Sequence, residues 1–138
     1  MKVALDTNVV LDLLANRVEF VEAATAIFYQ VETAKIQGIL CATTFTTLHY
    51  LLTKSLSAKI ANQSIKKLLL LFEIAPVTRQ VIELASVSKQ ADFEDAVLAI
   101  AAAQAGAELI ITRNPRDFMQ GPLQVITPTE WLVQNTLR

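Results

Sequence analysis

Hydrophobic and polar residues follow two different periods along the chain, and these periods predict alternating strands and helices. Short apolar runs such as Lys2–Leu5 and Glu108–Thr112 are typical of strands that are buried on both faces. Elsewhere apolar residues recur at helical spacing, as Val9, Val10 and Leu13 do. The predicted strands cover residues 2–5, 39–42, 72–75, 108–112 and 124–126. The predicted helices, counted from a capping residue where one is present, cover 8–15, 19–37, 43–54, 57–71, 78–88, 92–104 and 129–137.

Capping residues and the order of the elements predict an α/β fold. Ser57, Thr78 and Asp92 each precede a helical segment, as N-cap residues do. Either Thr43 or Thr44 is expected to cap the helix after the second strand, and Gly38 to stop the helix before that strand. Short strands alternating with helices favour a parallel sheet covered by helices on both faces. In such sheets, ligands bind outside the carboxyl ends of the strands.

Length and composition narrow the class of protein. The 138 residues favour one domain over residues 1–138, and 53% apolar residues suffice for a packed core. No apolar run approaches the ~20 residues of a membrane span, and the acid at position 6 comes too early for a secretory signal. The one cysteine, Cys41, excludes an internal disulfide and fits a reducing compartment, so we expect a cytoplasmic protein.

The net charge of −1 argues against a broad basic surface that grips nucleic acid. It leaves room for a local basic rim, for which Arg79, Arg113 and Arg116 are candidates, although scattered surface charge is the more common explanation for such residues.

Acidic residues stand where this architecture places its sites. They lie at a strand end or a helix start in three regions: Asp6 with Asn8; Asp92, Glu94 and Asp95; and Asp117 with Thr112 and Asn114. Clustered carboxylates raise one another's pKa, and a divalent cation relieves the repulsion because Mg²⁺ and Mn²⁺ prefer oxygen ligands. Such a cation activates water and stabilises the leaving oxygen in phosphodiester cleavage.

Most of these acids also have a purely structural explanation. Asp92 and Asp95 fit an N-cap and a first-turn acid, and Glu94 fits a solvated helix residue. Asp117 fits a plain loop acid. Asp6 is the hardest to explain in this way, because it ends an apolar strand, where a carboxylate costs free energy unless it caps a helix or holds a cation.

Three motifs together resemble a known family. LDTNVVLDLL (5–14), DFEDAVLAIAA (92–102) and IITRNPRDF (110–118) are similar, in order and spacing, to PIN domains, and most of all to VapC-type toxins of bacterial toxin–antitoxin pairs. The resemblance covers Lys2 to Trp131. It implies a three-layer α/β/α sandwich with a five-stranded, mainly parallel sheet. It also implies an endoribonuclease that depends on Mg²⁺ or Mn²⁺, forms a homodimer and binds an antitoxin protein.

The resemblance assigns roles residue by residue. Asp6 and Asp95 match the positions that bind the metal, and Asn8 orients the first acid. Asp92 adds a carboxylate near Asp95. The remaining site residues come from the last motif, which supplies Thr112, Asn114 and Asp117, and the sequence leaves open which of the last two lies nearer the metal.

One position departs from the family pattern. The family usually carries a glutamate early on the helix after the second strand, and Thr47 stands there in CATTFTTLHYLL. A threonine can bind a metal-bound water but supplies no charge. Either the site binds its cation more weakly, or Asp92 or Glu94 supplies the missing carboxylate. The alternative function is a catalytically weak PIN module that binds RNA or protein.

Other phosphoryl-transfer classes fit less well. A haloacid-dehalogenase-like phosphatase needs a second aspartate where Asn8 stands, and a receiver domain needs one at the end of FEIAPVT, which has none. His49 is expected to be a packed or surface helix residue. Trp131, Leu132 and Leu137 of the last helix are expected in the core or at an apolar dimer face.

Overall fold

The computed structural model describes residues 1–136, and residues 137 and 138 lie outside the described part. Five strands alternate with seven helices and one short 3₁₀ helix over this range. In chain order the elements are β1 (Lys2–Leu5), α1 (Thr7–Leu14), α2 (Val21–Glu32), β2 (Gln37–Cys41), α3 (Ala42–Ser55), α4 (Ala58–Leu71), β3 (Glu73–Ala75), α5 (Arg79–Ser86), α6 (Phe93–Gln104), β4 (Leu109–Ile111), η1 (Pro115–Phe118), β5 (Gln124–Ile126) and α7 (Pro128–Thr136).

The strands form one sheet in the order β3-β2-β1-β4-β5, and every neighbouring pair is parallel. β1 lies at the centre, where Val3 is in register with Gly38 on one side and Leu109 on the other. The chain builds outward from β1 to β3 and then returns to add β4 and β5 on the other side. The strand order therefore reverses between β1 and β4, where ligand sites of such sheets form.

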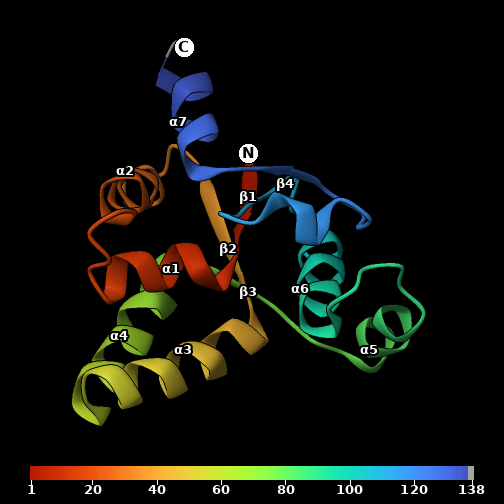
Figure 1. The fold of residues 1–138 in the computed structure, drawn as a ribbon, viewed down its shortest axis with the longest axis horizontal. Helices are drawn as coiled ribbons and strands as arrows, with labels where there is room; N and C mark the ends of the chain where they lie inside the picture. Colours follow the sequence, from red (N-terminus) through yellow and green to blue (C-terminus); the bar gives the residue numbers. More distant parts are fainter. Residues whose placement is uncertain (137–138) are drawn as a thin grey trace.

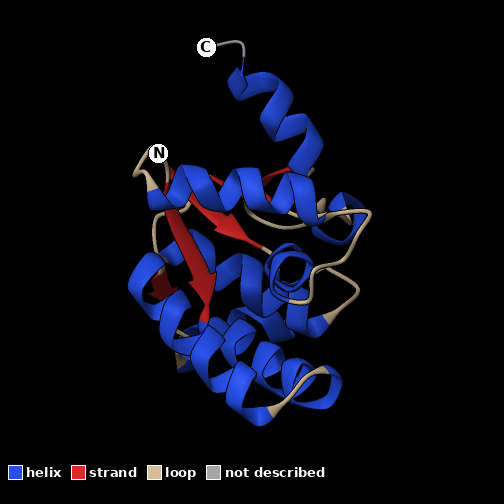
Figure 2. Ribbon diagram, turned by 90° about the vertical axis from the view of Figure 1, so that its left-hand side faces the viewer, coloured by secondary structure: helices blue, strands red, loops and turns tan. Residues whose placement is uncertain are grey.

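The sheet is the middle layer of three (Figure 1). Val3 and Leu5 of β1 pack against the layer of α1, α2, α3, α4 and α7. Ala4, between them, faces the layer of α5 and α6. Figure 2 shows helices of the first layer in front of the strands. The α/β/α sandwich that the sequence predicts is confirmed, with a sheet that is parallel throughout.

The buried side of α6 consists mostly of alanine, with Val97 and Leu98 beside the alanines. Its buried residues share one core with Ile39 and Ile110 of the sheet, and they include Ala96, Ala99, Ala101 and Ala102. Small side chains let a helix lie close to its neighbour, because the separation depends on the side chains at the contact. The first turn of α6 is thereby held beside the carboxyl ends of the central strands.

Two predictions of element ends are wrong. α2 ends at Glu32 rather than at residue 37, because Ala34 turns the chain with a φ of 59°. Gly38 lies inside β2 instead of stopping a helix, and a Cβ there would lie 2.5 Å from the ring of Phe72. Neither Thr43 nor Thr44 caps α3, whose N-cap is Cys41 with no side-chain hydrogen bond.

The last helix contributes to the core. Trp131 is 3% exposed, and its indole N–H donates to Oε1 of Gln30 at 2.9 Å, which ties α7 to α2. Trp131 is therefore a core residue and not part of a dimer face. The predicted end of this helix, Leu137, lies outside the described residues. No helix within residues 1–136 is both long enough and apolar enough to cross a membrane.

Candidate active site

Asp6 joins the two central strands at their carboxyl ends. Its backbone N–H donates to the carbonyl of Ile111 at 3.0 Å. Its Oδ1 accepts from the backbone N–H of Thr7 at 2.7 Å and caps α1, and its Oδ2 accepts from Oγ1 of Thr112 at 2.7 Å. The residue is 8% exposed. Burial raises the pKa of Asp6 above its usual value, although both hydrogen bonds oppose the shift.

The acids of DFED lie at the start of α6, and each has different surroundings. Asp92 caps the helix, because its Oδ1 accepts from the backbone N–H of Asp95 at 2.9 Å. Glu94 accepts a hydrogen bond from the hydroxyl of Thr47 at 3.1 Å. The position without the family's glutamate thus lies beside a carboxylate from another helix.

Asp95 is the half-buried acid of this group, and its pKa is raised to about 7. Burial is the largest cause, and the charges of Asp6, Asp92, Asp117 and Glu94 add to it. Carboxylates from three separate segments are therefore close enough to oppose one another's ionisation.

These acids line one open depression of about 280 Å³. Its polar and charged lining residues are Asp6, Thr7, Asn8, Arg17, Asp92, Glu94, Asp95, Asn114 and Asp117. The three regions of the sequence predicted to converge are brought together here. The remaining candidates, Thr112 and Thr47, do not line the depression. Each donates a hydrogen bond to an acid that does, Thr112 to Asp6 and Thr47 to Glu94.

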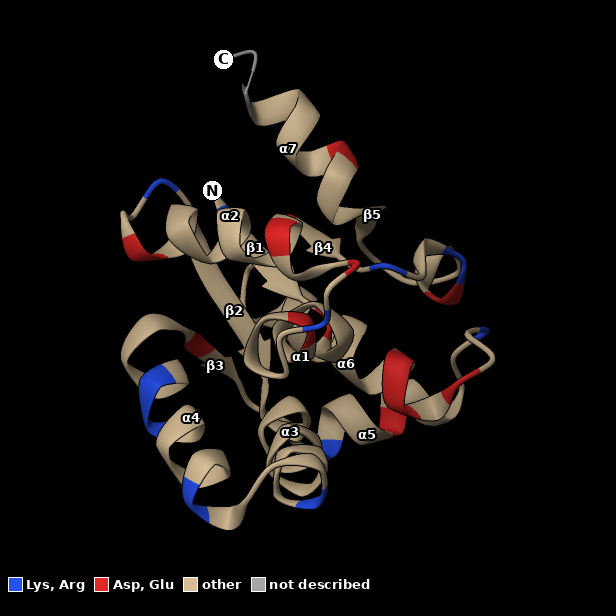
Figure 3. Cartoon of the chain, turned by 60° about the vertical axis from the view of Figure 1, so that its left-hand side comes forward, with Lys and Arg blue, Asp and Glu red and all other residues tan. Residues whose placement is uncertain are grey.

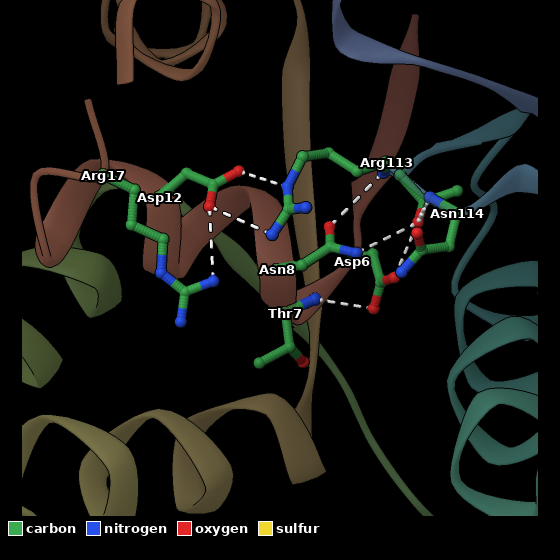
Figure 4. A network of polar contacts seen from close by, with 8 residues as sticks. Asp6, Thr7, Asn8, Asp12, Arg17, Arg113 and Asn114 are labelled. Carbon is green, nitrogen blue, oxygen red and sulfur yellow. Dashed lines mark hydrogen bonds and ion pairs between the residues drawn. The ribbon is translucent and has the colours of Figure 1, made fainter. Parts of the chain in front are cut away.

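Three hydrogen bonds of the last motif meet at the hydroxyl of Thr112, and they connect Asp6, Asn8 and Asn114, which Figure 4 labels. Nδ2 of Asn8 donates to Oγ1 of Thr112 at 3.5 Å, and the backbone N–H of Asn114 donates to the same oxygen at 3.0 Å. Asn8 therefore reaches Asp6 through Thr112 and not directly. Asp117, in contrast, raises the pKa of both Asp6 and Asp95 by its charge. Of Asn114 and Asp117, it is Asp117 that acts electrostatically on the two acids.

The donor set matches a hard divalent cation in chemistry and charge. Every acidic ligand candidate in the depression offers oxygen, and Arg17 is the one cationic residue lining it within residues 1–136. Carboxylates and water are the ligands that Mg²⁺ and Mn²⁺ prefer. No three His, Cys, Asp or Glu side chains in this range are already grouped closely enough to hold a metal. The match to a divalent cation therefore rests on the excess of negative charge in the depression and not on a preformed set of ligands.

The predicted basic rim does not form from the three candidate arginines, because none of them lines the depression. Arg79 pairs with Glu83 on α5, with Nε 2.6 Å from Oε1. Arg113 turns toward α1, where its Nε lies 2.7 Å from Oδ2 of Asp12. Arg116 is exposed on η1.

Sequence reasoning missed Asp12 and Arg17. Asp12 is 1% exposed, and Arg17 lies 3.6 Å from it and lines the depression. A signal was present, since Asp12 interrupts an apolar run just as Asp6 does. His49 lies 2.8 Å from Oδ1 of Asn62, as expected of a packed or surface helix residue.

Comparison with known proteins gives one family match and a set of similar structures. A family model described as PIN domain matches residues 2–116. No sequence among curated proteins matches the chain.

Three solved structures illustrate the likeness in fold. VapBC2 from Rickettsia felis, bound to a promoter DNA fragment, shares 15% identity at a TM-score of 0.70, over 92% of this chain and 98% of that one. A toxin–antitoxin complex from Klebsiella pneumoniae shares 22% at 0.69, over 91% and 97%. Mycobacterium tuberculosis VapC20, a sarcin-ricin loop cleaving toxin, shares 14% at 0.62, over 78% and 86%.

Proposed function

Because the chain belongs to the PIN domain family, whose model spans residues 2–116, we propose that it is a ribonuclease that hydrolyses RNA phosphodiester bonds with Mg²⁺ or Mn²⁺. One observation carries this proposal. Acids from three segments surround one depression, and their mutual repulsion helps to raise the pKa of Asp95 to about 7. Carboxylates with perturbed pKa values in a cleft are typical of functional sites, where a bound cation or a reaction requires their charge.

Asp6 and Asp95 would hold the metal. A bound Mg²⁺ or Mn²⁺ would supply an activated water and stabilise the leaving oxygen. The two hydrogen bonds of Asp6, from Thr7 and Thr112, fix its carboxylate. Each leaves lone pairs on the acceptor oxygen, since a carboxylate has about four acceptor positions. Binding a cation would favour the ionised form of Asp95 and release its proton.

Glu94 is the better candidate for the missing carboxylate. Asp92 caps α6, and of the two proposed metal ligands its charge raises the pKa of Asp95 alone. Glu94 is held by the hydroxyl of Thr47, and its charge raises the pKa of both Asp6 and Asp95. Its carboxylate therefore acts on the same space as the two proposed metal ligands. Asn8 would support Asp6 through Thr112, and Asp117 would complete the acidic lining with Asn114 beside it.

The printed names of the similar structures support a biological role. The Rickettsia felis structure is of VapBC2, the Klebsiella pneumoniae structure is a toxin–antitoxin complex, and VapC20 is a sarcin-ricin loop cleaving toxin. On this basis we propose that the protein is the toxin of a toxin–antitoxin pair in the cytoplasm, with an antitoxin as its partner. A homodimer is proposed as well, through surfaces other than Trp131.

The competing function is a catalytically weak PIN module that binds RNA or protein. The absence of an acid at Thr47 favours it, as does the lack of a preformed group of three metal-binding side chains within residues 1–136. Metal binding and metal-dependent cleavage separate the two functions.

The test measures Mn²⁺ affinity by calorimetry and cleavage of total RNA over a Mn²⁺ titration. Asp6→Asn and Asp95→Asn are expected to lose measurable Mn²⁺ binding and to lower the cleavage rate about 1000-fold, since metal catalysis contributes several kcal/mol. Asparagine still caps α1 at position 6, so the fold is retained. Glu22→Gln, which removes an exposed acid of α2, is the control and should leave both quantities unchanged.

Wild-type protein that cleaves no faster than Asp6→Asn at any Mn²⁺ concentration would contradict the ribonuclease proposal. The binding-module function would then stand, because the fold does not depend on the acids.

A further inference from the structure

Asp12 on α1 holds two arginines with one carboxylate. Nε and Nη2 of Arg113 lie 2.7 and 3.2 Å from its two oxygens, which is a bidentate pair. Nη1 of Arg17 lies farther away, 3.6 Å from Oδ1. Figure 4 shows the two guanidinium groups meeting the carboxylate from different sides. One negative charge is therefore shared by two positive charges.

The two arginines differ in the number of contacts that their side chains make and in how exposed they are. Arg113 also stacks on Phe20, with its guanidinium carbon 4.0 Å from the ring centre, and its side chain is 22% exposed. Arg17 is 44% exposed, and the loose contact with Asp12 is its one ion pair within residues 1–136. Since Arg113 alone neutralises Asp12, the charge of Arg17 is a surplus.

The position of Arg17 is fixed although its guanidinium is free to bind. Its backbone N–H donates to the carbonyl of Asp12 at 3.0 Å. Its own carbonyl accepts from the N–H groups of Phe20 and Val21 at 2.9 and 2.8 Å. The side chain thus starts from a hydrogen-bonded turn between α1 and α2, and Arg17 lines the acidic depression.

An anionic substrate needs such a cation at this site. The depression is lined by Asp6, Asp92, Glu94, Asp95 and Asp117, and a divalent ion neutralises only two of these charges. A phosphodiester that approaches the remaining carboxylates is repelled. A guanidinium that forms no ion pair with those acids offsets this repulsion. It also offers two parallel N–H donors that match the oxygens of a phosphate.

We propose that Arg17 contacts a phosphate of the RNA substrate beside the acids, and that Asp12 aims it there. This inference rests on the proposed ribonuclease function. Arg17 is then the substrate-contacting residue and Asp12 the positioning residue. The lysines of helix α4 (Figure 3) do not line the depression.

The experiment measures binding of a short fluorescein-labelled single-stranded RNA of mixed sequence by anisotropy, in EDTA, over a series of salt concentrations. Each phosphate contact adds about 0.7 to the slope of log affinity against log salt for a single strand. Arg17→Ala is expected to lower the slope by about 0.7 and the affinity about tenfold at low salt. Arg17→Lys keeps the charge and the slope, with a smaller loss of affinity because the two parallel donors are gone.

Arg79→Ala is the matched control, because it removes an exposed arginine that pairs with Glu83 outside the depression. It should leave slope and affinity unchanged. Arg17→Ala should also keep the wild-type melting temperature and Mn²⁺ affinity, since Asp12 retains Arg113. An unchanged slope in Arg17→Ala, an equal loss in Arg79→Ala, or a loss of Mn²⁺ binding in Arg17→Ala would overturn the assignment.

The two proposals fail in different ways. Wild-type protein without Mn²⁺ binding or cleavage refutes the ribonuclease, and the salt slope in EDTA still reports whether Arg17 contacts phosphate. Protein that cleaves RNA with an unchanged Arg17→Ala slope refutes the Arg17 assignment alone.

Discussion

Two acidic regions lie at opposite ends of α1, Asp6 at its start and Asp12 near its end, and their charges are compensated differently. Asp12 is buried against two arginines that the chain itself supplies. Asp6 and Asp95 are surrounded by further acids, and no Lys or Arg within residues 1–136 forms an ion pair with either. The charge of Asp12 is neutralised within the chain, whereas the charges of the second region are left without an ion-pair partner among the described residues. Buried charge that serves the fold is usually neutralised internally. Carboxylates left uncompensated in a cleft are typical of functional sites, which is why the proposed metal site is placed in the second region.

The largest expected effect comes from breaking the compensated region. Arg113→Ala leaves the carboxylate of Asp12 buried with only the distant Arg17, and removing one partner of a buried ion pair is strongly destabilising. We expect the free energy of unfolding to fall by about 3 kcal/mol, measured by urea denaturation. Arg116→Ala, an exposed arginine three residues on, should change it by less than about 0.5 kcal/mol. Equal values for the two variants would show that Asp12 does not need its partner.

A smaller effect tests whether Glu94 belongs to the uncompensated region. Glu94→Thr should weaken Mn²⁺ affinity about tenfold, because a carboxylate beside the cation is lost. Thr47→Glu should not improve on wild type, since two carboxylates would then face each other across the 3.1 Å contact. The exchange variant Thr47→Glu with Glu94→Thr returns one carboxylate to this place from the other helix.

Calorimetry on the exchange variant decides the matter. Recovery to within about threefold of the wild-type Mn²⁺ affinity is expected, which is a cost of less than 1 kcal/mol. Affinity as low as in Glu94→Thr would mean that Glu94 and Thr47 do not share a site.

The smallest effect is the pH dependence of stability without metal. The pKa of Asp95 is raised from 3.8 to about 7, so the folded protein binds a proton that the unfolded chain has released. The stability that this proton provides is present below pH 3.8 and is lost as the pH rises through about 7. In EDTA, Asp95→Asn should therefore melt at a higher temperature than wild type at pH 8, with little difference at pH 3.8.

Thermal unfolding at several pH values measures this difference. Glu22→Gln should show no comparable gain at pH 8. A gain for Asp95→Asn that is the same at every pH would indicate a general packing effect and contradict the electrostatic explanation.

Sequence patterns predicted this fold well where the determinants are local. Ser57, Thr78 and Asp92 cap helices as expected, because a cap depends on residues only a few positions away. Gly38 was misread as a helix stop. A glycine is required there because the ring of Phe72, from a distant part of the chain, leaves no room for a Cβ. Thr44 likewise shares a hydrogen bond with Thr7 at 3.0 Å instead of capping its own helix.

The candidate site shows the same limit. Asp6 was found because an acid at the end of an apolar strand has few explanations. Asp12 carried a similar signal, but its partner Arg113 is separated from it by 101 positions, and nothing local marks such a pair. The role of Arg17 follows only once Arg113 is known to neutralise Asp12. The acids could be found from the residues next to them in the sequence. The proposed role of Arg17 could be inferred only from the long-range pair of Asp12 with Arg113 in the structure.

The alanine face of α6 sets a limit on how the site can change. Ala96, Ala99 and Ala102 lie on the side of α6 that packs in the core, together with the larger Val97 and Leu98. The size of these side chains sets how closely the helix approaches the sheet. A valine or leucine there would be acceptable to a hydrophobic core, yet it would push the helix outward and carry Asp95 away from Asp6. Substitution of these alanines is therefore expected to change the separation of two carboxylates that lie outside the core. The volume of core residues in α6 is therefore expected to influence the geometry of the candidate site. A survey of only the polar residues would overlook this influence.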